Sequence, residues 1–151
     1  MEESKPIVFK LDNEQYGVDI DRVEGIEKEQ NVVRVPNSVP YIKGIMNLRG
    51  EIIAVYNLRN KFTMNTPAPE HPQYIVVRIG EHKVALEVDG VTEIQNISSE
   101  DIFDMPEIVT KGGLLYFEKI IRSKTGLVML IDVDHLLTEE ELGIIDEMVK
   151  Q

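Results

Sequence analysis

The feature that most constrains this 151-residue chain is an internal repeat. Shifted by 68 positions, residues 7–26 fall on residues 75–94 without a gap. Apolar residues meet apolar residues along this block, and Lys10 meets Arg78. A repeat of this kind indicates two copies of one supersecondary unit.

A second repeated block extends the unit. Residues 52–58 meet residues 127–133 at an offset of 75, so the second copy holds seven extra residues, which we place in a longer loop. Within the first copy, residues 7–11 and 16–20 read as strands and residues 12–15 as a turn. Neither copy carries the ten or more residues of helical period that a βαβ unit needs. We therefore expect antiparallel lobes, small enough to close as barrels.

A proline-rich connector divides the chain. The three prolines between residues 67 and 72 cannot lie inside a β-ladder, so this segment predicts an extended link. We expect one domain over residues 1–151, with a first lobe at about 7–66 and a second at about 73–137. A lobe of about 65 residues buries only a thin core, so the two lobes should pack on each other.

One helix is clearly signalled, over residues 138–150. Thr138 followed by Glu141 has the pattern of a capping box, and the acidic first turn suits the helix dipole. An apolar stripe at helical spacing follows, formed by Leu142, Ile145 and Met148 or Val149. We expect this helix to pack on the second lobe rather than to bind a partner.

The charge of the chain restricts its partners. The formal net charge is −11, from 27 acidic and 16 basic residues, so the chain repels a phosphate backbone and an anionic membrane surface. Its longest apolar runs have strand length, which argues against membrane insertion. The absence of cysteine excludes disulfides and thiolate chemistry. Without a signal-peptide pattern at the N-terminus, we expect a cytoplasmic protein.

Catalytic constellations are weak. None of the three histidines has a second ligand at metal-site spacing; they are His71, His82 and His135. Two acidic pairs recur in both copies, which favours a role at strand ends over paired catalytic carboxylates; they are Asp19 with Asp21 and Glu87 with Asp89. The chain also lacks a glycine-rich phosphate loop. We expect neither enzymatic activity, nor a cofactor, nor a metal.

The segment from residue 40 to 53 differs from the rest. It interleaves apolar residues with Gly44 and Gly50, and Arg49 stands between Leu48 and Gly50. Such glycines permit positive φ or a close approach of two backbones. An arginine in an apolar setting requires a carboxylate or carbonyl partner, within the fold or across an interface.

This segment resembles the signature of the CheW family, adaptors of bacterial chemotaxis, which reads roughly P-x-y-I-x-G-h-x-N-L-R-G-x-h-h-P-V-h-D/N-L. The resemblance continues in residues 16–20, 88–91 and 130–137, and it covers the chain from about 7 to 147. It implies an all-β fold with a C-terminal helix, in which two five-stranded SH3-like barrels pack about a pseudo-twofold axis. The internal repeat supports this arrangement independently.

The resemblance also implies partners. Family members bind the regulatory domain of the histidine kinase CheA through the first barrel, and the groove between the barrels receives the cytoplasmic tip of a chemoreceptor. We expect a monomer alone and a member of rings or arrays in complex. The groove candidates are Ile20, Val23, Ile26, Val91 and Ile94. The kinase-interface candidates are Tyr41, Lys43, Gly44, Leu48 and Gly50, with Arg49 as the signature arginine.

Three positions depart from the family pattern. Gly25 stands where a glutamate usually pairs with the signature arginine, so Arg49 needs another acceptor, for which we choose Glu24 or Glu27. The other two departures are Ala54 in place of proline and Lys119 near the place of a glycine. We expect altered contacts and an unaltered fold.

Two other interpretations remain open. The same domain occurs in CheV adaptors and in CheA itself, within longer chains, and the capped terminal helix favours a complete protein over such a piece. From a different class, a small ligand-binding or hydrolytic β-barrel would need a polar pocket with convergent titratable groups.

Overall fold

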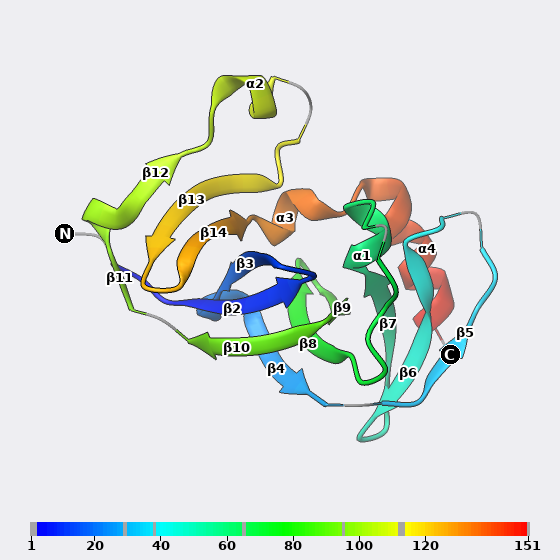
Figure 1. Ribbon diagram of the computed structural model, residues 1–151. Helices are drawn as coiled ribbons and strands as arrows, with labels where there is room; N and C mark the ends of the chain where they lie inside the picture. Colours follow the sequence, from blue (N-terminus) through cyan, green and yellow to red (C-terminus); the bar gives the residue numbers. More distant parts are fainter. Residues whose placement is uncertain are drawn as a thin grey trace.

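Two curled β-sheets lie side by side in the computed structural model of this chain (Figure 1). The structure describes residues 3–28, 30–37, 39–64, 66–94, 96–111 and 114–150. Sheet I has the order β4 (Val23–Glu27), β8 (Gln73–Ile79), β9 (His82–Val88), β7 (Glu51–Asn57), β6 (Ile42–Leu48) and β5 (Val32–Arg34). Sheet II has the order β10 (Gly90–Ile94), β2 (Pro6–Leu11), β3 (Glu14–Asp19), β14 (Gly126–Ile131), β13 (Phe117–Ser123) and β12 (Ile102–Asp104). The short strands β1 (Glu3–Ser4) and β11 (Ile97–Ser98) pair with each other.

The repeat of the sequence is a repeat of strand pairing. Val23 lies opposite Val77 and Val91 lies opposite Phe9, two pairs related by the 68-residue offset. Both β4 and β10 shift register at the residue after these valines, so even the β-bulge is repeated. The predicted all-β, two-lobed fold is confirmed, with six strands in each sheet where five were expected.

The two halves exchange their first hairpin. Strands β2 and β3 belong to sheet II, where β3 runs parallel to β14. Strands β8 and β9 belong to sheet I, where β9 runs parallel to β7. The sheets therefore do not follow the predicted lobe ranges 7–66 and 73–137, because each sheet takes two strands from the other half. Sequence offsets reveal which strands are equivalent, but they do not reveal whether a strand pairs with strands of its own copy or of the other copy.

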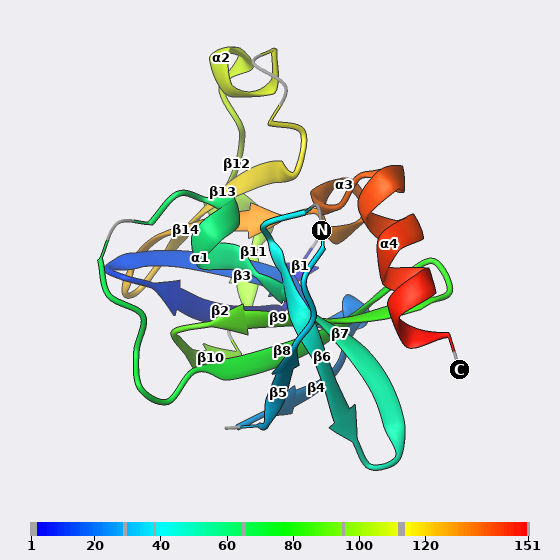
Figure 2. The ribbon, with the colours of Figure 1, turned by 90° about the vertical axis from the view of Figure 1, so that its right-hand side faces the viewer.

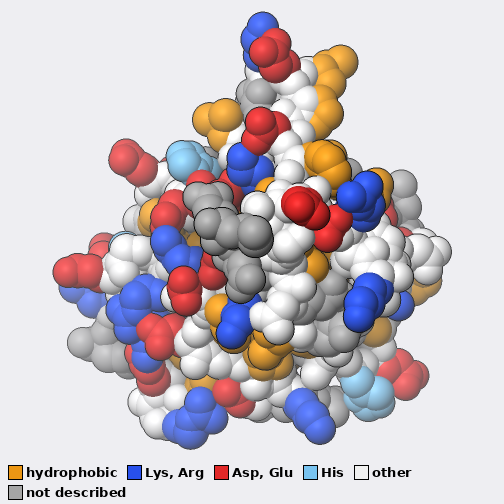
Figure 3. All heavy atoms as spheres, turned by 90° about the vertical axis from the view of Figure 1, so that its left-hand side faces the viewer, with side chains coloured by type: hydrophobic (Ala, Val, Ile, Leu, Met, Phe, Trp, Pro, Cys, Tyr) orange, Lys and Arg blue, Asp and Glu red, His pale blue; other side chains and the backbone are white. Residues whose placement is uncertain are grey.

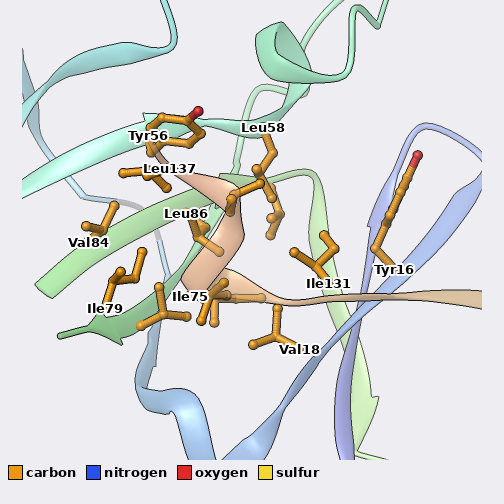
Figure 4. Close-up of a cluster of buried hydrophobic side chains, with 14 of the residues drawn as sticks. Tyr16, Val18, Tyr56, Leu58, Ile75, Ile79, Val84, Leu86, Ile131 and Leu137 are labelled. Carbon is orange, nitrogen blue, oxygen red and sulfur yellow. The ribbon is translucent and has the colours of Figure 1, made fainter. Parts of the chain in front are cut away.

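Alternate residues of the exchanged strands enter different cores. In β2, Ile7 and Phe9 belong to a large cluster between the sheets, while Val8 faces a smaller cluster inside sheet II. In β8, Ile75 belongs to the central cluster and Val76 to the cluster inside sheet I. Figure 4 shows the central cluster, to which β3, β7, β9 and β14 also contribute. Burial on both faces explains the uninterrupted apolar runs of β2 and β8.

The segments after β7 and β14 also cross between sheets. Helix α1 (Leu58–Lys61) follows sheet I and leads to Phe62, whose ring lies 5.3 Å from that of Tyr16 and 5.2 Å from that of Phe117, both in sheet II. Helices α3 (Val133–Leu136) and α4 (Glu139–Val149) follow sheet II, and α4 packs against β6 and β7 of sheet I (Figure 2).

The C-terminal helix begins as predicted and packs elsewhere. The capping box of Thr138 and Glu141 is present, with the Thr138 hydroxyl accepting from the Glu141 N–H at 3.1 Å. The prediction that this helix packs on the second lobe is wrong, since it covers the sheet built mainly from the first half. Its position is set by Ile145, which enters the central cluster, and by the buried Glu141, which accepts a hydrogen bond from the Tyr56 hydroxyl at 3.1 Å. Three other short helices are α2 (Glu107–Thr110), η1 (Ile20–Arg22) and η2 (Ser99–Asp101).

Gly44 permits the closest backbone approach recorded at any described glycine. A Cβ atom on this residue would lie 2.0 Å from the Val33 carbonyl oxygen of β5. The equivalent position in sheet II is Lys119, which also follows a register shift and lies opposite Asp104 of β12. The absence of a glycine at Lys119 is therefore compatible with the fold, while glycine at 44 is required by it.

The exchange of hairpins predicts that neither half folds alone. A fragment of residues 67–151 lacks β2 and β3, which separate β10 from β14 in sheet II, and residues 1–66 lack the equivalent strands of sheet I. We expect each fragment alone to give an NMR spectrum with poorly dispersed amide resonances, as an unfolded chain does. The equimolar mixture of the two fragments should recover the dispersed spectrum of the whole chain. The control is the intact chain cut within residues 67–72 after folding, which should stay folded. A well-dispersed spectrum from either fragment alone would contradict the exchange.

A pair of glycine variants tests the contact of β5 with β6. Gly44→Ala should lower the free energy of unfolding by about 2–4 kcal/mol, because the new methyl group forces the β5 backbone to move. Gly143→Ala, in an exposed turn of α4 with nothing within 4 Å of the added Cβ, should raise it by about 0.5–1 kcal/mol. Urea denaturation of both variants measures these changes in the free energy of unfolding. The same change in both variants would show that β5 does not constrain residue 44.

Candidate partner-binding surfaces

The five groove candidates divide into two environments. Ile20, Val23 and Val91 are half-buried and pack against the central cluster between the sheets. Ile26 and Ile94 are exposed, by 39% and 53%, near the ends of the equivalent strands β4 and β10. Val23 and Val91 thus occupy the same position in the two copies, each at a bulge in an edge strand, with part of the side chain open to solvent.

The surroundings of Val23 are more polar than an apolar groove requires. An open depression of about 670 Å³ lies beside it, and its other lining residues are Asp21, Arg22, Glu24, Arg78, Gly80 and Asp134. Four of the five charged side chains form two ion pairs, Arg22 with Asp134 and Arg78 with Glu24 at 2.6 Å. The hydrogen bond from Arg78 lowers the pKa of the exposed Glu24 carboxyl. Because Asp21 alone among these residues has no ion pair with another described residue, this depression lacks the convergent unpaired groups of a catalytic pocket.

Arg49 lies at the tip of the β6–β7 hairpin. Leu48 pairs with Glu51, so Arg49 and Gly50 form a two-residue turn with φ of +52° and +89°, the pattern of a type I′ turn. The Asn47 side chain accepts from the Gly50 N–H at 2.8 Å. Gly50 is therefore needed by the turn, and Arg49 occupies a conformation that costs an L-residue about 1 kcal/mol.

The ion pair of Arg49 is formed with Glu27, one of the two predicted acceptors, at 3.2 Å. The other, Glu24, pairs with Arg78 instead. The apolar setting expected for Arg49 is wrong, because its side chain is 73% exposed. The guanidinium is therefore free to make further contacts, and the pair with Glu27 contributes little to stability.

The remaining kinase-interface candidates have different accessibilities. Gly44 and Leu48 are buried, Leu48 within the cluster inside sheet I. Tyr41 is half-buried, with the Lys61 ammonium 5.0 Å from its ring centroid. The Lys43 side chain is 41% exposed and pairs with the buried Glu87 at 3.0 Å. Of these residues, Tyr41, Lys43 and the hairpin tip present atoms to solvent.

The repeated acidic pairs have structural partners. Asp19 accepts from the Asp21 N–H at the start of η1, and Glu87 holds Lys43. Asp89 accepts from the Asp12 N–H at 2.7 Å and from the buried Arg59 at 2.5 Å. Arg59 also binds the Thr66 carbonyl oxygen at 2.6 Å, which fixes the start of the connector. The pattern of these carboxylates supports the fold, as inferred from their repetition.

An exposed apolar arm was missed by sequence reasoning. The arm, residues 105–111 and 114–116, projects from sheet II between β12 and β13, and hydrophobic side chains gather on it (Figure 3). Ile108 is 85% exposed and Leu115 57%. The signal was available in the length of the second copy: the segment between β12 and β13 is five residues longer than the segment between β5 and β6, and it includes apolar residues without a strand or helix period. An apolar insertion of this kind indicates a contact surface.

The second lobe differs electrostatically from the first. Glu118 takes the place of Lys43 under the 75-residue offset. Partial burial and the nearby Asp132 and Asp19 carboxylates raise the pKa of Glu118. Asp132 in turn lies 2.6 Å from the ring of His135, in helix α3.

In the described part of the chain, no helix combines the length and apolar character that crossing a bilayer takes.

Comparison with known proteins places these features in a family. The family model described as the CheW-like domain matches residues 5–141. The chemotaxis protein CheW of Klebsiella aerogenes is 32% identical over 145 residues, covering 95% of this chain and 87% of its own. That of Treponema pallidum is 29% identical over 146 residues, covering 93% and 86%.

A solved structure agrees with the fold. The crystal structure of the scaffolding protein TtCheW from Thermoanaerobacter tengcongensis superposes with a TM-score of 0.82 at 29% identity, over 93% of this chain and 97% of that one. With the family match over residues 5–141, the relative at 32% identity and the structural superposition in agreement, the chain belongs to the family of CheW-like domains.

Proposed function

We propose that this chain is a non-enzymatic adaptor that couples chemoreceptors to the histidine kinase CheA in bacterial chemotaxis, in the cytoplasm and without a cofactor. The observation that carries the proposal is the pair Val23 and Val91, equivalent in the repeat and half-exposed over one shared core. A scaffold needs surfaces rather than catalytic groups, and four of the five charges in the depression beside Val23 are held in ion pairs.

The proposed receptor site spans the two edge strands β4 and β10. Val23 and Val91 anchor it over the central cluster, and the exposed Ile26 and Ile94 extend it along each strand. Apolar anchors of this kind contribute most of the binding energy of an interface, while charged rim residues adjust rate and specificity. The paired charges beside Val23 would form such a rim, which fits a moderate interface of the signalling class.

The proposed kinase site is the face of sheet I that carries Tyr41, Lys43 and the Arg49 hairpin. These groups lie on β6 or at its two ends and present atoms to solvent. Gly44 and Leu48 support this face from within, through the β5 contact and the core of sheet I. The apolar arm offers a second, separate contact on sheet II, which would let the monomer join rings or arrays.

A double variant tests the receptor site. Val23→Asp with Val91→Asp should lower the affinity for a receptor cytoplasmic fragment by about a hundredfold, since each carboxylate would be desolvated at the interface. Affinity for the CheA regulatory domain should stay within about twofold. Leu127→Asp, at an exposed position of sheet II, is the matched control and should change neither affinity. Circular dichroism first confirms that each variant is folded. Calorimetric titration then measures the affinity of each protein for the receptor fragment and for the CheA regulatory domain. Receptor affinity preserved in the double variant would refute the groove.

Two substitutions of Arg49 separate its fold role from a kinase contact. Arg49→Gly should leave the free energy of unfolding within about 0.5 kcal/mol, because relief of the positive φ offsets the lost exposed ion pair. Arg49→Ala should be less stable than Arg49→Gly by about 1 kcal/mol, since it keeps the strain. Both should lose about tenfold in affinity for the kinase domain. Full kinase affinity in Arg49→Gly would remove Arg49 from the interface.

A further inference from the structure

Two exposed positions reverse their charge between the lobes. Arg34 lies opposite Gly44 in the β5–β6 pairing, and Asp104 lies opposite Lys119 in the β12–β13 pairing. Because residues 44 and 119 are equivalent, Arg34 corresponds to Asp104. By the same 75-residue offset, Lys43 corresponds to Glu118. Both basic residues are on sheet I and both acidic residues are on sheet II.

The basic pair lines a depression in sheet I. Its volume is about 440 Å³, and its lining combines Arg34 and Lys43 with prolines, short apolar residues and asparagines and contains no acidic residue: Val35, Pro36, Asn37, Val39, Pro40, Ile42, Asn57 and Asn60. Within the described ranges, no carboxylate lies at ion-pair distance from Arg34. Lys43 gives two hydrogen bonds to Glu87 and retains a third N–H for another acceptor. In a chain of net charge −11, this concentration of positive charge is local.

The equivalent face of sheet II carries an excess of carboxylates. The exposed Asp104 forms an ion pair with Lys119, and the excess negative charge lies around Glu118, which is near the carboxylates of Asp19 and Asp132. Asp19 corresponds to Glu87, so the attractive Lys43–Glu87 pair of sheet I is replaced by two like charges. A partner segment that is attracted to one face is repelled by the other.

We propose that this charge reversal lets a partner distinguish the two lobes, and that the depression in sheet I receives an acidic segment of that partner. Since the lobes share strand order and register, the faces of their strands alone give weak discrimination between them. Contacts between like charges raise the free energy of binding an acidic segment at sheet II, so repulsion at the wrong lobe provides specificity. The identity of the partner, the kinase regulatory domain, rests on the proposed function. The inference adds that this domain presents an acidic segment to sheet I.

A charge-reversal series tests the proposal against that partner. Arg34→Glu should weaken binding of the regulatory domain about tenfold and abolish much of its salt dependence, with Arg34→Gln intermediate. Asp104→Arg, the matched change at the equivalent position, should leave the affinity within about twofold. Titrations at low salt and at about 150 mM salt give these values. The proposal is overturned if Arg34→Glu binds like the unmodified chain, or if Asp104→Arg weakens binding as much.

A second probe separates this proposal from the proposed function. Failure of the unmodified chain to bind the kinase domain would count against the adaptor role, whereas hexaglutamate tests the surface without the kinase. In NMR titrations at low salt, hexaglutamate should shift the amides of residues 34, 43, 57 and 60, and Arg34→Glu should abolish these shifts. Shifts around residues 104 and 118 instead, or none at all, would refute the assignment of the acidic segment to sheet I.

Discussion

The parallel pairing of β3 with β14 and of β9 with β7 is the constraint on which the rest of the structure depends. It inserts a hairpin from each half into the sheet of the other half, so that these strands are buried on both faces. Ile7 and Ile75 then meet between the sheets, while Val8 and Val76 fill the separate interiors. The two lobes are consequently one folding unit, since neither sheet is complete without both halves of the chain.

The same exchange produces the asymmetry of the molecule. Each half ends by crossing to the opposite sheet, but the first crossing is short and ends with Phe62 against Tyr16 and Phe117, whereas the second continues into α4. Glu141 secures that helix by capping it and by accepting the Tyr56 hydroxyl, whose pKa is raised by burial and by this carboxylate. Only sheet I is covered by such a helix among the described residues, and only sheet II carries the apolar arm.

Sequence alone was sufficient for the features that depend on residue class at a fixed spacing. The repeat predicted equivalent strands in the two copies, and the capping box predicted the start of α4. The exchange of hairpins was not predictable from the same pattern. A strand that is apolar on both faces is compatible with the sheet of its own half and with the sheet of the other half. The exposure of Arg49 was missed for a related reason. Arg49 has apolar residues close to it in the sequence, which suggested an apolar environment. In the structure it lies in a two-residue turn between strands, and its side chain points to water.

A duplicated scaffold must keep its buried positions alike and separate its functions on its surface. The residues of the central cluster retain their apolar class between the two copies, as Ile7 and Ile75 do. Divergence is concentrated on the surface: in the charges of Arg34 and Lys43 against those of Asp104 and Glu118, and in the arm. Because the pairing is the same in both lobes, a partner that discriminates between them must recognise such differences. The proposed receptor site therefore uses positions at which the two copies agree, Val23 and Val91, whereas discrimination between the lobes uses positions at which they disagree.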